Sequence, residues 1–362
     1  MRIAYIINSS EGGGAAAVTP PVIRFLREQG HEVRLFILTP KDRNALPVLQ
    51  ATGAAIHLRE GGHSDHAATL LWLLRQISAW KPTYLWTSLT RATLLGQIVG
   101  RITRTPVISW QHNAWLKPAN LFLLRKMSRL SDIWIGDSDH VTALTKTRLN
   151  IPAERLFSWP VFSVRPDAPQ AQAWLPGETI RIGSLGRLHD AKGYDILLKA
   201  LSLLREDTTL PPFHVEIAGE GSKREELEKQ AALYAPGKVY FSGFCQDSDR
   251  FLANLHLYLQ PSRREGFCIA THEALQAGLP VIATDVGELK HSLSQSGAGL
   301  CIPVENPTCL AQALKQLLGT PEHLHTLGLK GRNWIRQRYS EDNFRKAGSA
   351  ILAAAEQRLP TN

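Results

Sequence analysis

The segment LHLYLQPSRREGFCIATHEALQAGLPVIATD, residues 255–285, contains two short apolar runs with a helical pattern between them. The first run covers residues 255–260 and the second covers residues 279–285, and proline interrupts or ends both. A strand, a helix and a second strand in this order form a βαβ unit, in which the two strands lie parallel. The segment therefore predicts a parallel sheet that is covered by helices.

The same alternation continues in both directions along the chain. Apolar runs of strand length recur with helical patterns between them: RIAYIIN, HEVRLFIL, TYLWTS, PVISW and DIWIG before the middle of the chain, and TIRIGSLG, FHVEIAG, KVYFSG and GAGLCIP around the opening segment. Runs that are apolar throughout are typical of strands buried on both faces. The predicted fold class is therefore α/β, with doubly wound parallel sheets.

A proline-rich break separates the two series of runs. Residues 159–178 contain four prolines and no periodic apolar pattern, and the whole chain has 362 residues. One core rarely serves a chain of this length, so we expect two Rossmann-like domains, residues 1–163 and 164–339. A helical tail, about residues 340–362, is expected to pack back on the first domain. Open α/β sheets bind ligands at the carboxyl ends of their strands, and we expect both to face an interdomain cleft.

Composition restricts the class of protein and its partners. Hydrophobic residues make up 44% and charged residues 20%, as in soluble globular proteins. The four cysteines form no CxxC pair, and the first apolar run is too short for a signal sequence, which predicts a cytoplasmic protein. Residues 1–163 carry 19 basic and 10 acidic side chains, whereas residues 164–362 carry 22 of each. This excess predicts a phosphate-bearing substrate or an anionic membrane surface as partner, and no basic run interleaved with aromatic residues suggests nucleic acid.

Two strand-to-helix turns have residues suited to anions. Three glycines, Gly12 to Gly14, follow the first strand and would let backbone N–H groups approach an anion. After the first strand of the second domain, Arg187 and Lys192 flank a short loop and could clamp a diphosphate. Neither turn matches a complete phosphate-binding motif, and solvated loop charges are the alternative interpretation of the two cations.

Two carboxylates, Glu265 and Glu273, stand on either side of a turn and the start of a helix expected near residue 270. The free N–H groups of that helix would favour an anion, and the two carboxylates could accept hydrogen bonds from paired sugar hydroxyls. The alternatives are a first-turn acid that stabilises the helix dipole for Glu273 and a surface charge beside Arg263 and Arg264 for Glu265.

Four segments together resemble the retaining glycosyltransferases of family 4, in order and in approximate spacing. They are GRLHDAKG, IAGEG, VYFSGF and EGFCIATHEALQAGLPVIATDVGE, of which the last contains the E-x7-E pattern from Glu265 to Glu273. The resemblance covers nearly the full chain. It implies the GT-B fold, with a nucleotide-sugar donor on the C-terminal domain and an acceptor mainly on the N-terminal domain.

The resemblance also implies roles for particular residues. Arg187 and Lys192 would hold the donor diphosphate, Glu273 the ribose, and Glu265 the hydroxyls of the transferred sugar, while His112 would lie near the reacting sugar. These four groups near the reaction are therefore expected to be His112, Arg187, Lys192 and Glu265. The remaining donor-binding positions are expected to be Gly13, Gly14, Gly186, Gly219, Gly221, Phe244, Gly266, Phe267, Cys268, Ile269 and Glu273.

Two departures from the family pattern are visible, because the family usually has glycine at Cys268 and a PNG turn near Pro160, where this chain has WPVFS. Asp-x-Asp pairs occur at residues 137–139 and 247–249, and both are interpreted as helix starts. With two cations available for the diphosphate, we expect no metal and no cofactor.

The resemblance implies transfer of a hexose or N-acetylhexosamine with retention, by front-face attack, from a UDP-sugar or from GDP-mannose. The acceptor would be a glycan or a lipid-linked, possibly phosphorylated, molecule of cell-surface polysaccharide or lipopolysaccharide synthesis in a bacterium. A non-catalytic nucleotide-sugar-binding protein, a sugar-nucleotide epimerase and a phosphorylase are the alternatives.

The segment NLFLLRKMSRLSDIW, residues 120–134, is the predicted membrane contact. Its apolar stripe would be Leu121, Leu124, Met127 and Leu130, with Arg125, Lys126 and Arg129 beside it. A core helix with a solvated basic side is the alternative. Membrane contact would give a peripheral location at the cytoplasmic face of the inner membrane.

Overall fold

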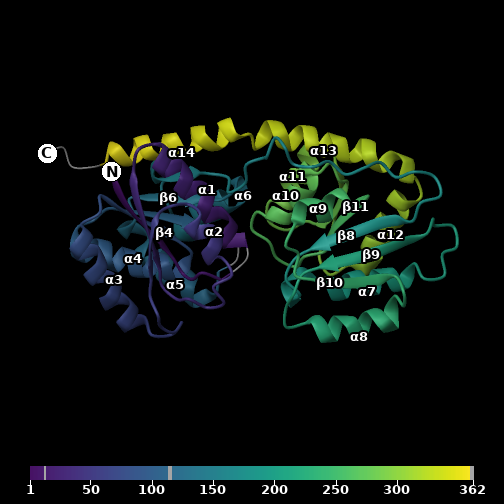
Figure 1. Ribbon diagram of the computed structural model, residues 1–362, viewed down its shortest axis with the longest axis horizontal. Helices are drawn as coiled ribbons and strands as arrows, with labels where there is room; N and C mark the ends of the chain where they lie inside the picture. The colour runs from purple at the N-terminus through teal and green to yellow at the C-terminus, as the bar shows by residue number, and fades with distance from the viewer. Residues whose placement is uncertain (12–13, 113–115, 359–362) are drawn as a thin grey trace. The chain divides into compact units, whose positions relative to one another are not determined.

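The computed structural model describes residues 1–11, 14–112 and 116–358, and the chain divides into two compact units (Figure 1). The first unit comprises Met1–Val161 together with Asp342–Asn362, and the second is the continuous segment Phe162–Glu341. Each unit has one sheet in which every described strand pair is parallel. The predicted architecture of two doubly wound parallel-sheet domains is confirmed.

The first unit contains a seven-stranded sheet in the order β3-β2-β1-β4-β5-β6-β7 among its described residues. Its strands are β1 (Arg2–Ile7), β2 (Glu32–Ile37), β3 (Ala55–Leu58), β4 (Tyr84–Ser88), β5 (Val107–Gln111), β6 (Ile133–Gly136) and β7 (Leu156–Ser158). Its helices are α1 (Gly14–Glu28), α2 (Leu46–Gln50), α3 (His66–Trp80), α4 (Thr90–Thr103), α5 (Pro118–Met127), α6 (Asp139–Leu149) and α14 (Glu341–Glu356), with short 3₁₀ turns at Ser128–Leu130 and Ala153–Arg155. All residues of β4 and β5 are buried, because helices cover both faces of the sheet.

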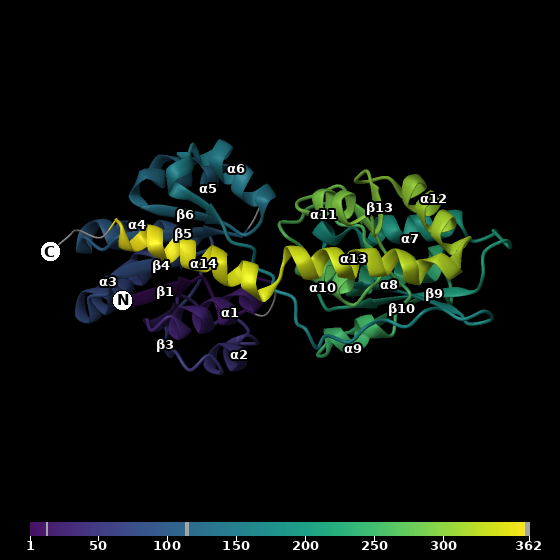
Figure 2. The same cartoon turned by 90° about the horizontal axis from the view of Figure 1, so that it is seen from above.

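Tryptophan packing dominates the core of the first unit near β5. Trp110 stacks on Trp159 with 4.9 Å between ring centroids, and Phe344 of α14 lies 5.1 Å from Trp159. The hydroxyl of Tyr84 donates a 2.6 Å hydrogen bond to the carbonyl of Ala355. Figure 2 shows α14 lying across the sheet of this unit. The C-terminal helix therefore covers apolar surface that residues 1–161 would otherwise expose.

The second unit contains a six-stranded sheet in the order β10-β9-β8-β11-β12-β13 among its described residues. Its strands are β8 (Ile180–Leu185), β9 (Phe213–Ala218), β10 (Val239–Gly243), β11 (Leu257–Gln260), β12 (Val281–Thr284) and β13 (Gly299–Ile302). Its helices are α7 (Tyr194–Leu203), α8 (Arg224–Tyr234), α9 (Ser248–Ala253), α10 (Ile269–Gln276), α11 (Leu289–Ser296), α12 (Pro307–Leu318) and α13 (Leu324–Arg338), with 3₁₀ turns η3 (Asp190–Lys192) and η4 (Pro321–His323). Helices α7 and α8 cover one face of this sheet, and α10, α11 and α13 cover the other (Figure 1).

The strand order of the second unit reverses between β8 and β11. The chain runs outward from β8 through β9 to β10 and then returns to pair β11 with β8, where Leu257 is in register with Ile182. Loops that leave such a reversal point diverge to opposite faces of the sheet, which opens a crevice for a ligand at the carboxyl ends of the strands. The loops after β8 and β11 are therefore where this fold favours a binding site.

The proline-rich segment after Trp159 has no regular secondary structure, but it packs closely on the second unit. The N–H of Val164 donates to the carbonyl of Tyr339 at 2.8 Å, and that of Ala171 donates to Ala277 at the same distance. Val164 and Ala171 are both buried. The segment is thus a fixed part of the second unit along these residues. Among the described helices, none combines the length and hydropathy needed to cross a bilayer.

Candidate functional site

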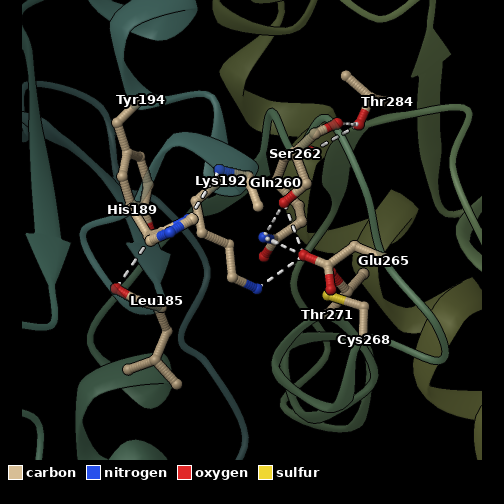
Figure 3. A network of polar contacts seen from close by, with 12 residues as sticks. Leu185, His189, Lys192, Tyr194, Gln260, Ser262, Glu265, Cys268, Thr271 and Thr284 are labelled. Carbon is tan, nitrogen blue, oxygen red and sulfur yellow. Dashed lines mark hydrogen bonds and ion pairs between the residues drawn. The ribbon is translucent and has the colours of Figure 1, made fainter. Parts of the chain in front are cut away.

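A lysine and a glutamate meet at the reversal point of the second sheet. Lys192 ends the 3₁₀ turn after β8, and Glu265 lies in the loop after β11. The Lys192 Nζ and the Glu265 Oε1 are 2.7 Å apart, with 22% and 10% of the two side chains exposed (Figure 3). The structure therefore brings together two of the residues predicted from separate motifs.

The environment keeps Lys192 charged. Burial alone would lower the pKa of its ammonium group, but the carboxylate of Glu265 raises this pKa above its ordinary value. Close packing also holds the stem of the side chain, because a Cβ on Gly186 would lie 3.2 Å from Lys192 Cε. The site thus presents a fixed positive charge at the carboxyl end of β8.

Glu265 has two further partners that the sequence analysis did not identify. The Ser262 hydroxyl donates a 2.6 Å hydrogen bond to Glu265 Oε1, and the Gln260 amide donates a 3.2 Å bond to the same oxygen. Both residues are fully buried at the end of β11. The only signal in the sequence was two polar residues at alternate positions after an apolar strand, which places both on one face of the chain.

An arginine ties the two loops of the site together. Arg263 makes a paired hydrogen bond to the carboxylate of Asp195, at 2.7 and 2.8 Å, and its backbone N–H donates to the carbonyl of Ala191 at 2.8 Å. Its guanidinium group also contacts Glu305. Paired arginine–carboxylate bonds have a defined geometry, so these contacts fix the loop of Lys192 relative to the loop of Glu265.

Helix α10 begins one residue earlier than predicted, at Ile269, with Cys268 as its N-cap residue. Cys268 has a φ of 63° and a ψ of 74°, a left-handed conformation that glycine adopts at the least cost. Its buried thiol lies 3.3 Å from the Thr271 hydroxyl, and burial raises the pKa of the thiol to about 12. Cys268 is therefore a neutral packing residue at neutral pH.

The start of α10 rests on an aromatic cluster. Phe267 stacks on His272 with 3.8 Å between ring centroids, and Tyr339 meets both rings edge-on. The Nδ1 of His272 donates to the carbonyl of Cys268 at 2.9 Å, which leaves Nε2 to accept from the Ser292 hydroxyl at 2.9 Å. Burial lowers the pKa of His272 to about 4, so the ring is neutral. Phe267, one of the predicted donor-binding positions, is thus mainly a packing side chain.

Glu273 lies in the second turn of α10 and not in the first, so the interpretation as a first-turn acid that stabilises the helix dipole is wrong. Burial raises the pKa of Glu273 to about 7, and Arg165 opposes this rise. The guanidinium group of Arg165 is paired with Asp249, a neighbour that also raises the pKa of Glu273. A half-buried carboxyl group with this pKa is common where a ligand binds.

Three predicted glycines bring two loops of the second unit into contact. A Cβ on Gly219 would lie 2.0 Å from the carbonyl oxygen of Gly186, and one on Gly221 would lie 2.2 Å from that of Leu188. The loop after β9 therefore lies directly against the loop that leads from β8 to Lys192. Arg187, in the same loop after β8, is exposed.

His112, the residue predicted near the reacting sugar, belongs to the first unit and directly follows β5. Its ring stacks on Trp110 with 5.2 Å between centroids, and its Nδ1 lies 3.9 Å from Asp137 Oδ2. Burial lowers the pKa of His112 to about 3, so the imidazole is neutral at neutral pH and could act as a hydrogen-bonding group. Gly13 lies outside the described residues, and Gly14 begins α1.

The two Asp-x-Asp pairs have structural contacts. Asp247 caps α9 by accepting from the backbone N–H of Arg250 at 2.9 Å, as predicted for a helix start. In the other pair the capping residue is Ser138, and Asp139 accepts a 3.0 Å hydrogen bond from Ser158. Within either unit taken by itself, the described residues include no cluster of three or more His, Cys, Asp or Glu side chains that could share a metal ion.

Comparison with known proteins gives two family matches in succession along the chain. The model of Glycosyltransferase Family 4 matches residues 12–161, and the model of Glycosyl transferases group 1 matches residues 168–334. The chain belongs to glycosyltransferase family 4. The two matches fall on the two units described above.

Two curated relatives and one solved structure illustrate this glycosyltransferase family. One protein of human phosphatidylinositol N-acetylglucosaminyltransferase is 28% identical over 242 residues, which cover 62% of this chain and 50% of that protein. The lipopolysaccharide core biosynthesis glycosyltransferase LpsE of Rhizobium meliloti is 24% identical over 180 residues, which cover 49% of this chain and 51% of LpsE. The chain thus spans about half the length of these relatives. Anabaena HepE in complex with UDP-glucose is 17% identical, with a TM-score of 0.84 over 98% of this chain and 100% of that chain, which establishes a shared fold.

The family pattern explains the glycine after Val286. Gly287 has a φ of +57°, and a Cβ there would lie 2.3 Å from the carbonyl oxygen of Gly266 and 2.7 Å from that of Glu265. The N–H of Glu288 donates to the carbonyl of Gly266 at 2.9 Å. The loop after β12 therefore supports the backbone of Glu265 from below, and only glycine leaves room for that contact.

Replacing Gly287 by alanine is expected to destabilise the protein by about 3 kcal/mol, because it adds a steric clash to left-handed backbone strain. Thermal unfolding of Gly287→Ala should show this loss. Gly297→Ala is the matched control, since Gly297 has a φ of +58° with no atom near its Cβ position, and it should lose only about 1 kcal/mol. Equal losses in the two variants would show that the contact with Glu265 and Gly266 contributes nothing.

Phe244 is an exposed aromatic residue at the carboxyl end of the second sheet. It directly follows β10, and 70% of its surface is exposed. Large apolar side chains are rarely left this exposed without a use, and a free aromatic face at a strand end suits a nucleobase. This position agrees with the predicted base-binding edge of the family-4 donor site.

Replacing Phe244 by alanine is expected to weaken the binding of UDP by about tenfold or more, because aromatic stacking on a base contributes roughly 1–3 kcal/mol. Isothermal titration calorimetry would measure the change. Leu233→Ala, at a comparably exposed apolar residue on α8, should leave both UDP affinity and the melting temperature unchanged. UDP affinity that stays within twofold of wild type in Phe244→Ala would contradict a base contact.

The predicted membrane stripe is wrong in its residues. Leu124 is fully buried and packs in a core cluster with Trp134 and Leu149, so α5 turns the predicted stripe inward. The exposed apolar residues of α5 are Phe122, with 61% of its surface exposed, and Leu123, with 44%. The ammonium group of Lys126 lies 5.8 Å from the ring centroid of Phe122. The basic flank of the prediction thus accompanies a different apolar pair.

Proposed function

We propose that this chain is a metal-independent, retaining glycosyltransferase. It would move a hexose or an N-acetylhexosamine from a nucleotide-sugar to a glycan or lipid-linked acceptor in the synthesis of a cell-surface polysaccharide or lipopolysaccharide. The donor would bind the second unit, Phe162–Glu341, and the first unit would bind the acceptor.

The observation that carries this proposal is the contact of Lys192 with Glu265 at the reversal point of the second sheet. A fixed cation and a carboxylate side by side match the two ends of a nucleotide-sugar, because the ammonium group attracts the diphosphate and the carboxylate accepts bonds from sugar hydroxyls. Glu273 and Phe244 would then contact the ribose and the base. These four side chains account for every part of a donor molecule.

The reaction would proceed on one face of the sugar. The bond between the anomeric carbon and the diphosphate oxygen breaks, and its electron pair leaves with the nucleotide. The acceptor hydroxyl forms the new bond on the same face, and its proton passes to the departing phosphate oxygen. Lys192 would stabilise the negative charge that develops on that oxygen, and the neutral ring of His112 would hydrogen-bond the sugar.

Metal independence rests on the positive groups already present near the proposed phosphate position. Lys192 supplies a full charge, Arg187 is exposed in the same loop, and the backbone N–H groups at the start of α10 supply partial positive charge. The carboxylates of Asp139 and Asp247, which might otherwise suggest an Asp-x-Asp metal site, have the structural contacts described above.

UDP is favoured as the nucleotide, with GDP-mannose as the second candidate. The Anabaena protein whose fold this chain shares was crystallised with UDP-glucose. A lipid-linked or polysaccharide acceptor is supported by the names of the relatives, one of which acts on phosphatidylinositol while the other belongs to lipopolysaccharide core synthesis. An acidic acceptor also fits the excess of basic side chains in residues 1–163.

The decisive experiment is release of nucleotide from a panel of UDP-, GDP- and ADP-sugars, with and without EDTA, by wild type and by Glu265→Gln. Slow release from one donor that is insensitive to EDTA and lost in the variant would support a metal-independent transferase and identify its donor. Binding of a donor without release, even with candidate acceptors, would favour a non-catalytic nucleotide-sugar-binding protein. Conversion of the sugar without release of nucleotide would favour an epimerase.

Peripheral binding to the cytoplasmic face of the inner membrane is proposed for α5. Its exposed Phe122 and Leu123 could enter the headgroup region while Lys117, Arg125 and Lys126 contact anionic lipids. Wild type is expected to sediment with anionic liposomes at low salt, and a Phe122→Ser, Leu123→Ser double variant should lose about tenfold in membrane affinity. Leu71→Ser, at an exposed leucine on α3, is the control. Failure of wild type to sediment would refute this part of the proposal.

A further inference from the structure

One oxygen of Glu265 receives all the hydrogen bonds that the described residues make to this carboxylate. Lys192 Nζ lies at 2.7 Å, Ser262 Oγ at 2.6 Å and Gln260 Nε2 at 3.2 Å, and in each case the acceptor is Oε1 (Figure 3). An ionised carboxylate has acceptor capacity on both oxygens. The second oxygen, Oε2, is therefore the one left for a ligand.

The orientation of the Gln260 amide follows from its neighbours. Its Nε2 must face Glu265, because Oε1 of an ionised carboxylate can only accept. On its other side the Gln260 Oε1 accepts a 2.9 Å hydrogen bond from the Tyr258 hydroxyl, and that hydroxyl accepts a 3.2 Å bond from the backbone N–H of Leu185. A chain of donors thus runs from the end of β8 through Tyr258 and Gln260 to Glu265.

Ser262 joins the same chain. Its hydroxyl accepts from the Gln260 amide at 2.7 Å and donates its own proton to Glu265. Its backbone carbonyl accepts from the hydroxyl of Thr284, at the end of the neighbouring strand β12. Tyr258, Gln260 and Ser262 are all fully buried, so water does not compete for these bonds.

We propose that Gln260 and Ser262 are positioning residues of the donor site, which hold Glu265 by its Oε1 and thereby keep Oε2 directed at the sugar and Lys192 at the diphosphate. Without them, the carboxylate could rotate to bind Lys192 through both oxygens, which would remove its acceptor oxygen from the sugar and tie up the ammonium group. The inference rests on the proposed function, since it assigns Glu265 to the sugar hydroxyls.

The groups that act electrostatically with Glu265 come from three elements beside it. They are Lys192 from the turn after β8, Tyr194 from α7, Tyr258 from β11 and Cys268 from the start of α10. Burial raises the pKa values of both tyrosines and of the thiol, so these three are neutral between pH 5 and pH 9. A new charge at position 260 would consequently act on Glu265 against the ammonium group of Lys192.

Gln260→Glu and Ser262→Ala test the inference. Gln260→Glu places a second carboxylate beside Glu265 Oε1, and two carboxylates this close share a proton. The acidic limb of the pH profile of kcat is therefore expected to move up by at least about one pH unit. Ser262→Ala should lower kcat by about tenfold while the Kd for UDP, which has no sugar, stays within twofold. A general loss of packing would weaken UDP binding as well.

The chain offers a matched control for the loss of a buried glutamine–serine bond. Gln97 of α4 is fully buried, and its Nε2 donates to the Ser131 hydroxyl at 2.8 Å in the first unit. Gln97→Glu should leave the pH profile unchanged, and Ser131→Ala should leave kcat unchanged. If Gln260→Glu does not fold, Ser262→Ala, which removes a single oxygen, decides the question through the separation of kcat from UDP affinity.

A further readout does not depend on turnover. The carboxyl carbon of Glu265 can be followed by NMR in protein labelled with [δ-13C]glutamate, with Glu265→Gln to assign its signal. We expect the titration midpoint of this signal to rise by at least about one pH unit in Gln260→Glu and to stay unchanged in Gln97→Glu. Equal midpoints in wild type and Gln260→Glu would overturn the inference, whereas absence of turnover in wild type with shifted midpoints would count against the proposed function alone.

Discussion

Lys192→Ala is expected to lower the rate of sugar transfer by about 100- to 1000-fold. The ammonium group lies at the carboxyl end of β8, 2.7 Å from Glu265, where its charge is fixed before any donor binds. Removing a fixed positive group that stabilises a developing anion typically costs roughly 3–4 kcal/mol of transition-state stabilisation. Most of the loss should be in kcat, because the charge on the leaving diphosphate grows as the bond breaks.

Single-turnover kinetics with the donor identified by the panel would measure this effect. Lys315→Ala is the matched control, since Lys315 forms a 2.6 Å ion pair with Asp207 on the surface of the same unit. The control should retain wild-type activity, because exposed ion pairs contribute little to stability. A Lys192→Ala variant with more than a tenth of wild-type kcat would mean that another group neutralises the diphosphate.

Glu273→Gln is expected to raise stability and weaken donor binding together. Burial raises the pKa of Glu273 from an ordinary value of 4.5 to about 7. Between these two values the folded protein holds a proton that the unfolded chain has lost, so the contribution of Glu273 to stability falls as the pH rises from about 4.5 to 7. Above pH 7 the ionised, half-buried carboxylate destabilises the fold by about 2–3 kcal/mol.

Glutamine has the same shape without the charge, so the variant should melt roughly 5–10 °C higher than wild type at pH 8 and at the same temperature as wild type near pH 4. Its UDP affinity should fall by about tenfold or more, because an amide accepts ribose hydroxyls less well than a carboxylate. Glu225→Gln, at an exposed glutamate paired with Lys229, should change neither quantity. Melting curves that are parallel at both pH values would show that Glu273 does not titrate as inferred.

The parts of the fold that were predictable are those with a repeating pattern. Fully apolar runs such as RIAYII and YLWTS became buried parallel strands, because helices cover both faces of each sheet. The E-x7-E segment identified Glu265 and Glu273 as members of one loop and one helix. Contact between Lys192 and Glu265 was not stated beforehand, since the two motifs lie 73 positions apart in the sequence and meet only through the pairing of β8 with β11.

The errors arose where the sequence has more than one physical solution. On α5 the leucines and the exposed Phe122 alternate so closely that periodicity alone did not identify the buried face, and packing against Trp134 decided it. Ser138 and not an aspartate caps α6, because either side chain can accept from the N–H two or three residues on. Gln260 and Ser262 were missed because a buried amide and hydroxyl have no motif of their own.

The route of the chain through the two units has a consequence for synthesis. The second unit is one uninterrupted segment, whereas the first is completed only when α14 joins residues 1–161. During translation the second unit can therefore finish folding first, although most of the first unit leaves the ribosome before it. Until residues 341–356 emerge, the surface around Phe25 and Trp159 that Phe344 covers stays open to water and to chaperones.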